Sequence, residues 1–118
     1  MDVWSLLPVI GVVFIAVLLV GGLGGKADPR KVKRLVDAGA RLVDVRTREE
    51  YAAGHIAGAK NIPVADLEKR LGELGTDKAA PLVVYCASGL RSATAKRVLL
   101  GAGFKDVHDL GSMSRWPD

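Results

Sequence analysis

The sequence predicts an α/β domain built on a mainly parallel sheet and preceded by one membrane-spanning helix. Two observations carry this prediction. An uncharged run lies near the N-terminus, residues 4–23, and behind it short apolar strands alternate with helices of roughly ten residues. Such alternation is typical of βαβ units, in which helices cover both faces of the sheet. The chain has 118 residues, 49% of them hydrophobic, which suffices for one such core.

The apolar run has the length of a membrane anchor. As a helix, residues 4–23 would be about 30 Å long, enough to cross the hydrocarbon core of a bilayer. A cleaved signal peptide is disfavoured, because no positive charge precedes the run and no A-x-A-like site follows it. A buried helix of a soluble protein is disfavoured, because the run has no polar face. We therefore predict an anchor with a Gly-rich exit over residues 1–25 and a globular domain over residues 26–118.

Basic residues set the expected orientation of this anchor. Five of them follow the run closely and none precedes it: Lys26, Arg30, Lys31, Lys33 and Arg34. Because basic residues stay on the cytoplasmic side, the sequence predicts a single-pass membrane protein whose globular domain faces the cytoplasm. The net charge of +4 falls largely on this cluster, which indicates attraction to anionic lipids rather than binding to nucleic acid.

Capping and breaking residues delimit the elements of the globular part. The expected helices run from Asp28-Pro29 to Gly39, from Thr47 to Gly54, from Asp66 to Gly75 and from Ser92 to Leu100. The expected strands cover residues 41–45, 60–62, 81–85 and 107–110, and a final turn covers residues 112–116. The most strand-like of these segments is 81–85, so we expect it to be the central strand.

The chain has one cysteine, Cys86, directly after this strand. One cysteine cannot close an intramolecular disulfide. With only His55 and His108, and no CxxC or HxxxH pattern, we expect no structural metal and no cofactor. A free thiol fits a reducing compartment. A lone cysteine after an apolar strand is usually a small buried hydrophobe, so its neighbours must decide whether it is reactive.

The neighbours of Cys86 favour a reactive thiolate. The small residues that follow it let the backbone curl and point successive N–H groups inward, and a helix begins near Arg91 with its positive dipole end at the same point. Arg91 adds a permanent charge. Each effect stabilises a thiolate and lowers the pKa of Cys86 from its free value of about 8.5. We therefore predict an exposed nucleophile in a pocket that binds anions.

Three motifs resemble those of the rhodanese-like sulfurtransferases. CASGLRS (86–92) looks like the family's active-site loop, LVDVRTREEYAAGHIAGAKNIP (42–63) matches its other signature, and DLGSMSRWP (109–117) is similar to its closing Gly-Gly-x-x-x-Trp. The motifs occur in the family's order across residues 28–117. The resemblance implies a rhodanese-like α/β fold around a five-stranded parallel sheet, with only Gly25 to Asp28 available for the family's first strand.

The resemblance also implies roles. Cys86 would be the nucleophile that takes a sulfane sulfur from thiosulfate or a persulfide and passes it to a thiol, to cyanide or to a protein acceptor. Backbone N–H groups would cradle the persulfide, from Ala87, Ser88, Gly89, Leu90 and Arg91. Arg91 would also hold the anionic donor, and Ser92 would either donate to the persulfide or cap the helix. The expected supporting residues are Asp44, Arg46, Glu50, His55 and Trp116, with Glu49 or Glu50 facing Arg46 and Trp116 packing near the loop.

Other functions stay open at this point. The spacing from Cys86 to Arg91 is C-x4-R, one residue shorter than the C-x5-R loop of related phosphatases and arsenate reductases, which disfavours a phosphoryl substrate. Many members that use thiosulfate have a basic residue where this chain has Ala87, so a persulfide donor is a serious alternative. The main alternative to an enzyme is a non-catalytic binding or regulatory module tethered to the membrane. A sulfur relay to a partner protein is the third.

Overall fold

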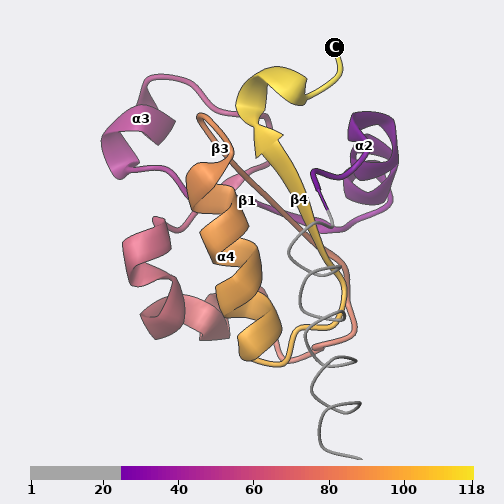
Figure 1. Cartoon of the computed structure of the whole chain (residues 1–118), viewed down its shortest axis with the longest axis vertical. Helices are drawn as coiled ribbons and strands as arrows, with labels where there is room; N and C mark the ends of the chain where they lie inside the picture. Colours follow the sequence, from indigo (N-terminus) through magenta and orange to yellow (C-terminus); the bar gives the residue numbers. More distant parts are fainter. Residues whose placement is uncertain (1–24) are drawn as a thin grey trace, which may run out of the picture.

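The computed structural model describes residues 25–118, which form a parallel sheet between two layers of helices (Figure 1). The four strands lie in the order β2-β1-β3-β4. They are β1 (Arg41–Asp44), β2 (Lys60–Asn61), β3 (Leu82–Cys86) and β4 (Val107–Ser112). The helices are α2 (Pro29–Asp37), α3 (Arg48–Ala52) and α4 (Leu90–Gly101), with the 3-10 segments η2 (Val64–Leu74) and η3 (Met113–Arg115). Within these residues the α/β prediction is confirmed.

The expectation of a five-stranded sheet is wrong for this part of the chain. The segment available for a first strand, residues 25–28, makes one backbone hydrogen bond to the sheet, from Ala27 N to the Asp109 oxygen of β4 (2.7 Å). The next residue, Asp28, already caps α2 by accepting from the Arg30 N–H. A strand needs room for repeated pairing, and the helix start leaves none. The sheet of residues 25–118 therefore has four strands.

Helix length bears on the predicted membrane anchor. Across residues 25–118, every helix is too short or too polar to span a bilayer. The predicted anchor, residues 4–23, lies outside the residues that the structure describes. It therefore stays a prediction from the sequence.

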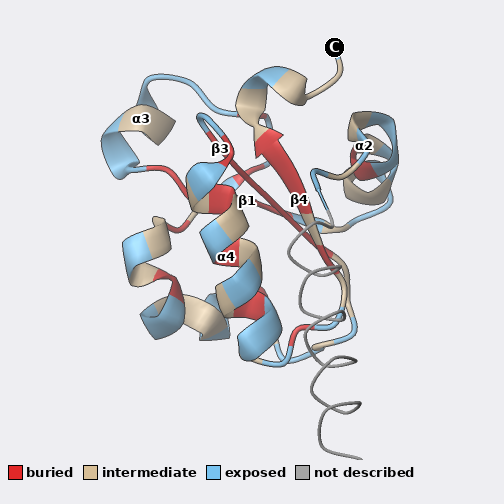
Figure 2. Cartoon of the chain, in the orientation of Figure 1, coloured by how far each residue is buried: buried red, intermediate tan, exposed pale blue. Residues whose placement is uncertain are grey.

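The core lies on both faces of the sheet because successive side chains of each strand point to opposite sides. On β3, Leu82, Val84 and Cys86 pack on the face covered by α4 and η2, whereas Val83 and Tyr85 pack on the face covered by α2. All five are buried, and Figure 2 shows the strands as the most buried part of the domain. A strand buried on both faces is apolar throughout, as residues 82–86 are.

Two elements differ from their expected form. The segment expected as an amphipathic helix from Asp66 is a 3-10 segment that begins at Val64 and is kinked at Arg70 (φ −116°, ψ 18°). It still buries Leu67 and Leu74, as its apolar spacing predicts. The last strand continues to Ser112, beyond the expected end at residue 110, and includes a register shift opposite Val84 and Tyr85. Because all four strands are parallel, the ends of β1, β3 and β4 meet at one edge of the sheet, where the loop after Cys86 lies.

Candidate active site

Cys86 is the last residue of β3, and a short loop joins it to α4. Gly89 precedes the helix with φ +99°, a left-handed conformation that glycine adopts without steric cost. The small residues Ala87 and Ser88 let the loop turn back over the strand end. The predicted strand–loop–helix arrangement is confirmed, with the helix beginning at Leu90.

The loop surrounds the sulfur with donors. Gly89 N donates to Cys86 Sγ at 3.0 Å, and Ser92 N donates to it at 3.3 Å. Burial raises the pKa of Cys86, but hydrogen bonds from the Ser92 hydroxyl and from the N–H groups of Ser92, Gly89 and Ser88 outweigh burial, so the pKa is lowered overall. In the structure the Ser92 hydroxyl donates to the Gly89 carbonyl oxygen at 3.1 Å. The loop therefore favours a thiolate.

The expectation of an exposed thiol is wrong. Cys86 is 0% exposed and packs in the same apolar cluster as Val84 and Leu99. Its loop neighbour Leu90 is 78% exposed, so the outer part of the loop faces solvent while the sulfur lies beneath it. A reagent must enter the loop to reach the sulfur. Cys86 is therefore a buried core residue whose sulfur nevertheless accepts hydrogen bonds, a combination that an inert core cysteine does not need.

Arg91 is held by a carboxylate. Its Nη1 donates to Glu50 Oε1 at 2.6 Å and its Nη2 to Glu50 Oε2 at 3.0 Å, a two-point pairing across the loop and α3. Glu50 also closes a capping box with Thr47, the arrangement that the spacing of these two residues in the sequence predicts. The hydrogen bonds from Arg91, and then those from Thr47, lower the pKa of Glu50 to about 2. The loop arginine therefore has its charge matched within the domain.

Asp44 and Arg46 form the centre of a buried polar network. Arg46 Nη2 donates to Asp44 Oδ2 at 2.7 Å and to the Gly54 carbonyl oxygen at 2.7 Å. The Tyr85 hydroxyl donates to Asp44 Oδ2 at 2.7 Å and accepts from Ile56 N at 3.1 Å. Burial, and then the Asp44 carboxylate, raises the pKa of Tyr85. These contacts join β1, β3 and the segment after α3.

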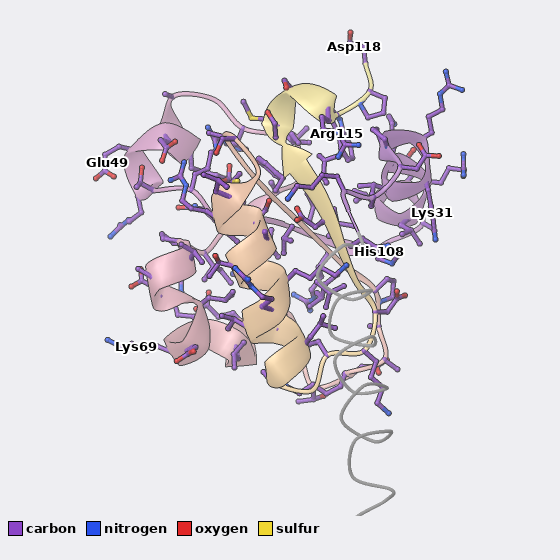
Figure 3. The ribbon with its side chains drawn as sticks, viewed as in Figure 1. Lys31, Glu49, Lys69, His108, Arg115 and Asp118 are labelled. Carbon is purple, nitrogen blue, oxygen red and sulfur yellow. The ribbon has the colours of Figure 1, made fainter. Side chains whose placement is uncertain are left out.

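The expectation that Glu49 or Glu50 faces Arg46 is wrong. Arg46 pairs with Asp44, and Glu50 pairs with Arg91. Glu49 is exposed, and Figure 3 shows its side chain pointing away from the domain. Asp44 is buried and lies only two residues before Arg46, so the guanidinium of Arg46 can reach its carboxylate. A buried carboxylate must be compensated nearby, which accounts for this pairing.

His55 and Trp116 contact residues other than Cys86. The His55 ring stacks on Tyr51, with ring centroids 3.6 Å apart and planes at 7°, and its Nδ1 lies 2.9 Å from the Tyr51 carbonyl oxygen. Trp116 packs against the α2-side core, with Lys33 Nζ 5.9 Å from its ring centroid. Both therefore have structural partners of their own, and neither contributes a hydrogen bond to Cys86.

Sequence reasoning missed two residues around the loop. The sequence marks Tyr85 only as a strand residue, although a hydroxyl in a fully buried strand requires a partner. The sequence marks Lys26 only as part of the basic cluster after the apolar run, but its Nζ donates to the Gly89 carbonyl oxygen at 2.8 Å. No sequence signal marks Lys26, because that contact joins residues 63 positions apart.

Comparison with known proteins identifies the family. The family model described as "Rhodanese-like domain" matches residues 28–118. Thiosulfate sulfurtransferase GlpE of Pseudomonas fluorescens is 37% identical over 95 residues, which cover 77% of this chain and 83% of that protein. An uncharacterised protein of Bacillus subtilis, YqhL, is 40% identical over 78 residues, which cover 65% of this chain and 60% of that protein. The chain therefore belongs to the rhodanese-like family.

Solved structures agree with this assignment. The human single-domain sulfurtransferase TSTD1 superposes with a TM-score of 0.70 at 31% identity, covering 77% of this chain and 93% of that one. A rhodanese from E. coli, solved with anions, superposes with a TM-score of 0.63 at 32% identity, covering 67% of this chain and 95% of that one. The predicted rhodanese-like fold and the resemblance to single-domain sulfurtransferases are confirmed.

Proposed function

We propose that the chain is a sulfurtransferase that carries sulfur as a persulfide on Cys86. One observation carries this proposal: the backbone N–H groups of Gly89 and Ser92 both donate to Cys86 Sγ, next to the start of α4. Donors in this arrangement stabilise a thiolate before the reaction and an anionic persulfide after it. The similarity to GlpE, a thiosulfate sulfurtransferase, supports the same chemistry.

The reaction needs only the thiolate and two sulfur substrates. The Cys86 thiolate attacks the sulfane sulfur of thiosulfate, an S–S bond to Cys86 forms, the S–S bond of thiosulfate breaks, and sulfite leaves with the bonding electron pair. A nucleophilic acceptor such as cyanide then attacks the outer sulfur, and the Cys86 thiolate leaves with the electron pair. Thiocyanate is the product, and no net oxidation of the protein occurs. Thiolate attack on sulfur of this kind requires no cofactor.

Two donors fit this site, thiosulfate and a persulfide. Thiosulfate is favoured by the relatives that carry its name, GlpE and PspE. A persulfide is favoured by Ala87, which provides no charge, and by the pairing of Arg91 with Glu50, which leaves the arginine less free to bind a dianion. Backbone N–H groups are then the main binding groups for either donor. A thiol, cyanide or a partner protein would accept the sulfur.

The proposed setting is the cytoplasmic face of a membrane. The uncharged run of residues 4–23 and the basic residues after it support a single-pass anchor with the catalytic domain in the cytoplasm. This proposal rests on the sequence. Its test is protease protection of the full chain in sealed membrane vesicles of known orientation.

Intact mass spectrometry of the reduced full chain tests the chemistry. Exposure to thiosulfate, or to a small-molecule persulfide, should add the mass of one sulfur atom, and cyanide should remove it. A Cys86→Ser variant should gain nothing. Failure of both donors to add sulfur to the wild-type chain would overturn the enzyme proposal in favour of a non-catalytic binding module. A difference between the two donors would identify the preferred one.

A further inference from the structure

Lys26 reaches into the domain from the segment that precedes α2. Its Nζ donates to the Gly89 carbonyl oxygen at 2.8 Å and pairs with Asp109 Oδ2 at 2.7 Å. The backbone beside it is tied to β4, where Ala27 N donates to the Asp109 oxygen. Lys26 therefore joins three separate parts of the chain: the residues before α2, the active-site loop and β4.

The surroundings of the Lys26 side chain are built to accept it. A Cβ at Gly89 would lie 3.2 Å from Lys26 Cε, and a Cβ at Gly111 would lie 3.1 Å from Lys26 Cδ. Glycine at both positions leaves the space that the methylene chain fills. Asp109 is only 4% exposed, and its other carboxylate oxygen accepts from Gly111 N at 2.8 Å. A buried carboxylate needs such compensation, and Lys26 supplies the charge.

We infer that Lys26, through its pairing with Asp109, is a positioning residue that holds the Gly89–Leu90 peptide of the active-site loop in the orientation that sulfur binding requires. It does not touch the sulfur. It acts through the Gly89 carbonyl oxygen, which is the other end of the peptide that carries the Leu90 N–H. The same residue, Gly89, donates its own N–H to Cys86 Sγ.

The Gly89 carbonyl oxygen accepts from Lys26 Nζ at 2.8 Å, from the Ser92 hydroxyl at 3.1 Å and from Ala93 N at 3.3 Å. Lys26 is the only charged donor among these three. Without it, the Ser92 hydroxyl and the Ala93 N–H are left to hold the Gly89 carbonyl group. Hydrogen bonds to charged groups are the stronger ones, so Lys26 fixes the peptide more firmly than Ser92 alone.

The test compares four variants of the full chain, Lys26→Met, Lys26→Arg, Asp109→Asn and the double variant Lys26→Met/Asp109→Asn, with the matched control Lys31→Met. Lys31 is an exposed lysine on α2, and Figure 3 shows it pointing away from the domain. The first readout is the pH profile of Cys86 alkylation by iodoacetamide, followed by mass spectrometry. The second is kcat and KM for sulfur transfer to cyanide, and thermal unfolding reports on folding.

We expect Lys26→Met to move the alkylation profile to higher pH and to slow alkylation at neutral pH by up to about tenfold, which corresponds to one pKa unit. Lys26→Arg, which keeps the charge and a donor, should restore most of the rate. In the double variant the uncompensated charge of Asp109 is gone, so thermal stability should recover relative to Lys26→Met. The alkylation profile should stay shifted, because the Gly89 carbonyl oxygen still lacks its charged donor.

Two outcomes would overturn the inference. One is a Lys26→Met profile that coincides with those of the wild type and Lys31→Met. The other is a double variant that recovers the alkylation profile together with stability, since Lys26 would then act only by neutralising Asp109. The effect on kcat rests on the proposed function, whereas alkylation does not. A chain that transfers no sulfur but shows the shifted profile would reject the proposed function and keep the positioning role.

Discussion

Arg91 of α4 and Glu50 of α3 bind each other through two hydrogen bonds, of 2.6 and 3.0 Å, although they lie 41 positions apart in the sequence. Glu50 also accepts from the Thr47 N–H at the start of α3. One carboxylate therefore fixes the start of a short helix and the first turn of the helix that follows Cys86. A pairing of this kind, with two parallel contacts, restricts geometry more than a single ion pair does.

The first prediction concerns acid stability. Arg91 and Thr47 lower the pKa of Glu50 from 4.5 to about 2, so the folded state binds the Glu50 proton less readily than the unfolded state. The stability that this carboxylate contributes is present above pH 4.5 and is lost as the pH falls toward 2. Denaturant unfolding from neutral pH down to about pH 2 should show Glu50→Gln to be less stable than the wild type at neutral pH and less sensitive to acid.

Glu73 provides the control for this measurement. Arg70, and then Lys60, lowers the pKa of Glu73 to about 2 as well, so Glu73 adds its own acid dependence to the wild type. A Glu73→Gln variant should keep the Glu50 contribution. Identical pH profiles for Glu50→Gln and the wild type would show that the pairing with Arg91 adds no stability.

The second prediction concerns the thiol. Ser92→Ala removes the hydroxyl beside Cys86 but keeps the Ser92 N–H that donates to the sulfur. Losing one hydrogen bond to a charged group costs up to about 3 kcal/mol, so the pKa of Cys86 should rise by no more than about two units. Iodoacetamide alkylation at a series of pH values measures this shift. The exposed Thr94 on the same helix gives the control Thr94→Ala, whose profile should match the wild type.

The third prediction concerns the buried network. Tyr85→Phe leaves Ile56 N without its hydrogen-bond partner inside the core and removes one donor from Asp44 Oδ2, which keeps Arg46. Unsatisfied buried groups cost about 1–3 kcal/mol, so the variant should lose free energy of unfolding in this range. Tyr51→Phe is the comparison, because the Tyr51 hydroxyl makes a single hydrogen bond, to the Ala59 carbonyl oxygen. Equal losses in the two variants would contradict the importance of the network.

The fourth prediction separates backbone strain from crowding in the active-site loop. Gly89 and Gly103 both have φ +99°, but a Cβ at Gly103 would meet nothing within 4 Å. Alanine at either position should cost about 1–2 kcal/mol, because L-residues disfavour this conformation. Gly89→Ala should in addition disturb Lys26 and slow the alkylation of Cys86. Thermal unfolding of Gly89→Ala and Gly103→Ala measures the backbone strain, and Cys86 alkylation measures the crowding of Lys26. Equal alkylation rates in the two variants would argue against crowding.

The sequence predicts well what depends on local chemistry. The position of Cys86 between a buried strand and a helix follows from the apolar run 82–85 and the small residues after it. The capping box of Thr47 and Glu50 is a contact within one turn, and it is confirmed. A prediction of this kind is confirmed when the residues of the element itself supply the hydrogen bonds that define it.

What the sequence predicts poorly depends on tertiary packing. The partner of Arg91 is set by where α3 and α4 meet, and the contact of Lys26 by where the segment before α2 meets β4. The resemblance predicts a fifth strand, but Asp28 starts a helix before a strand can form. The loop residues predict an exposed thiol, but the depth of Cys86 at the strand end depends on the packing of α4.

Both borders of the described sheet hinder pairing with another molecule's strand. The outer strand β2 has only two residues, begins with the charged Lys60 and is soon followed by Pro63. On the other border, Ala27 N and the Arg115 guanidinium occupy the outward carbonyl oxygens of Asp109 and Leu110. Short, charged or covered edges resist edge-to-edge aggregation. The segment that brings Lys26 to the loop thus also hinders edge-to-edge association between the sheets of neighbouring copies of the domain.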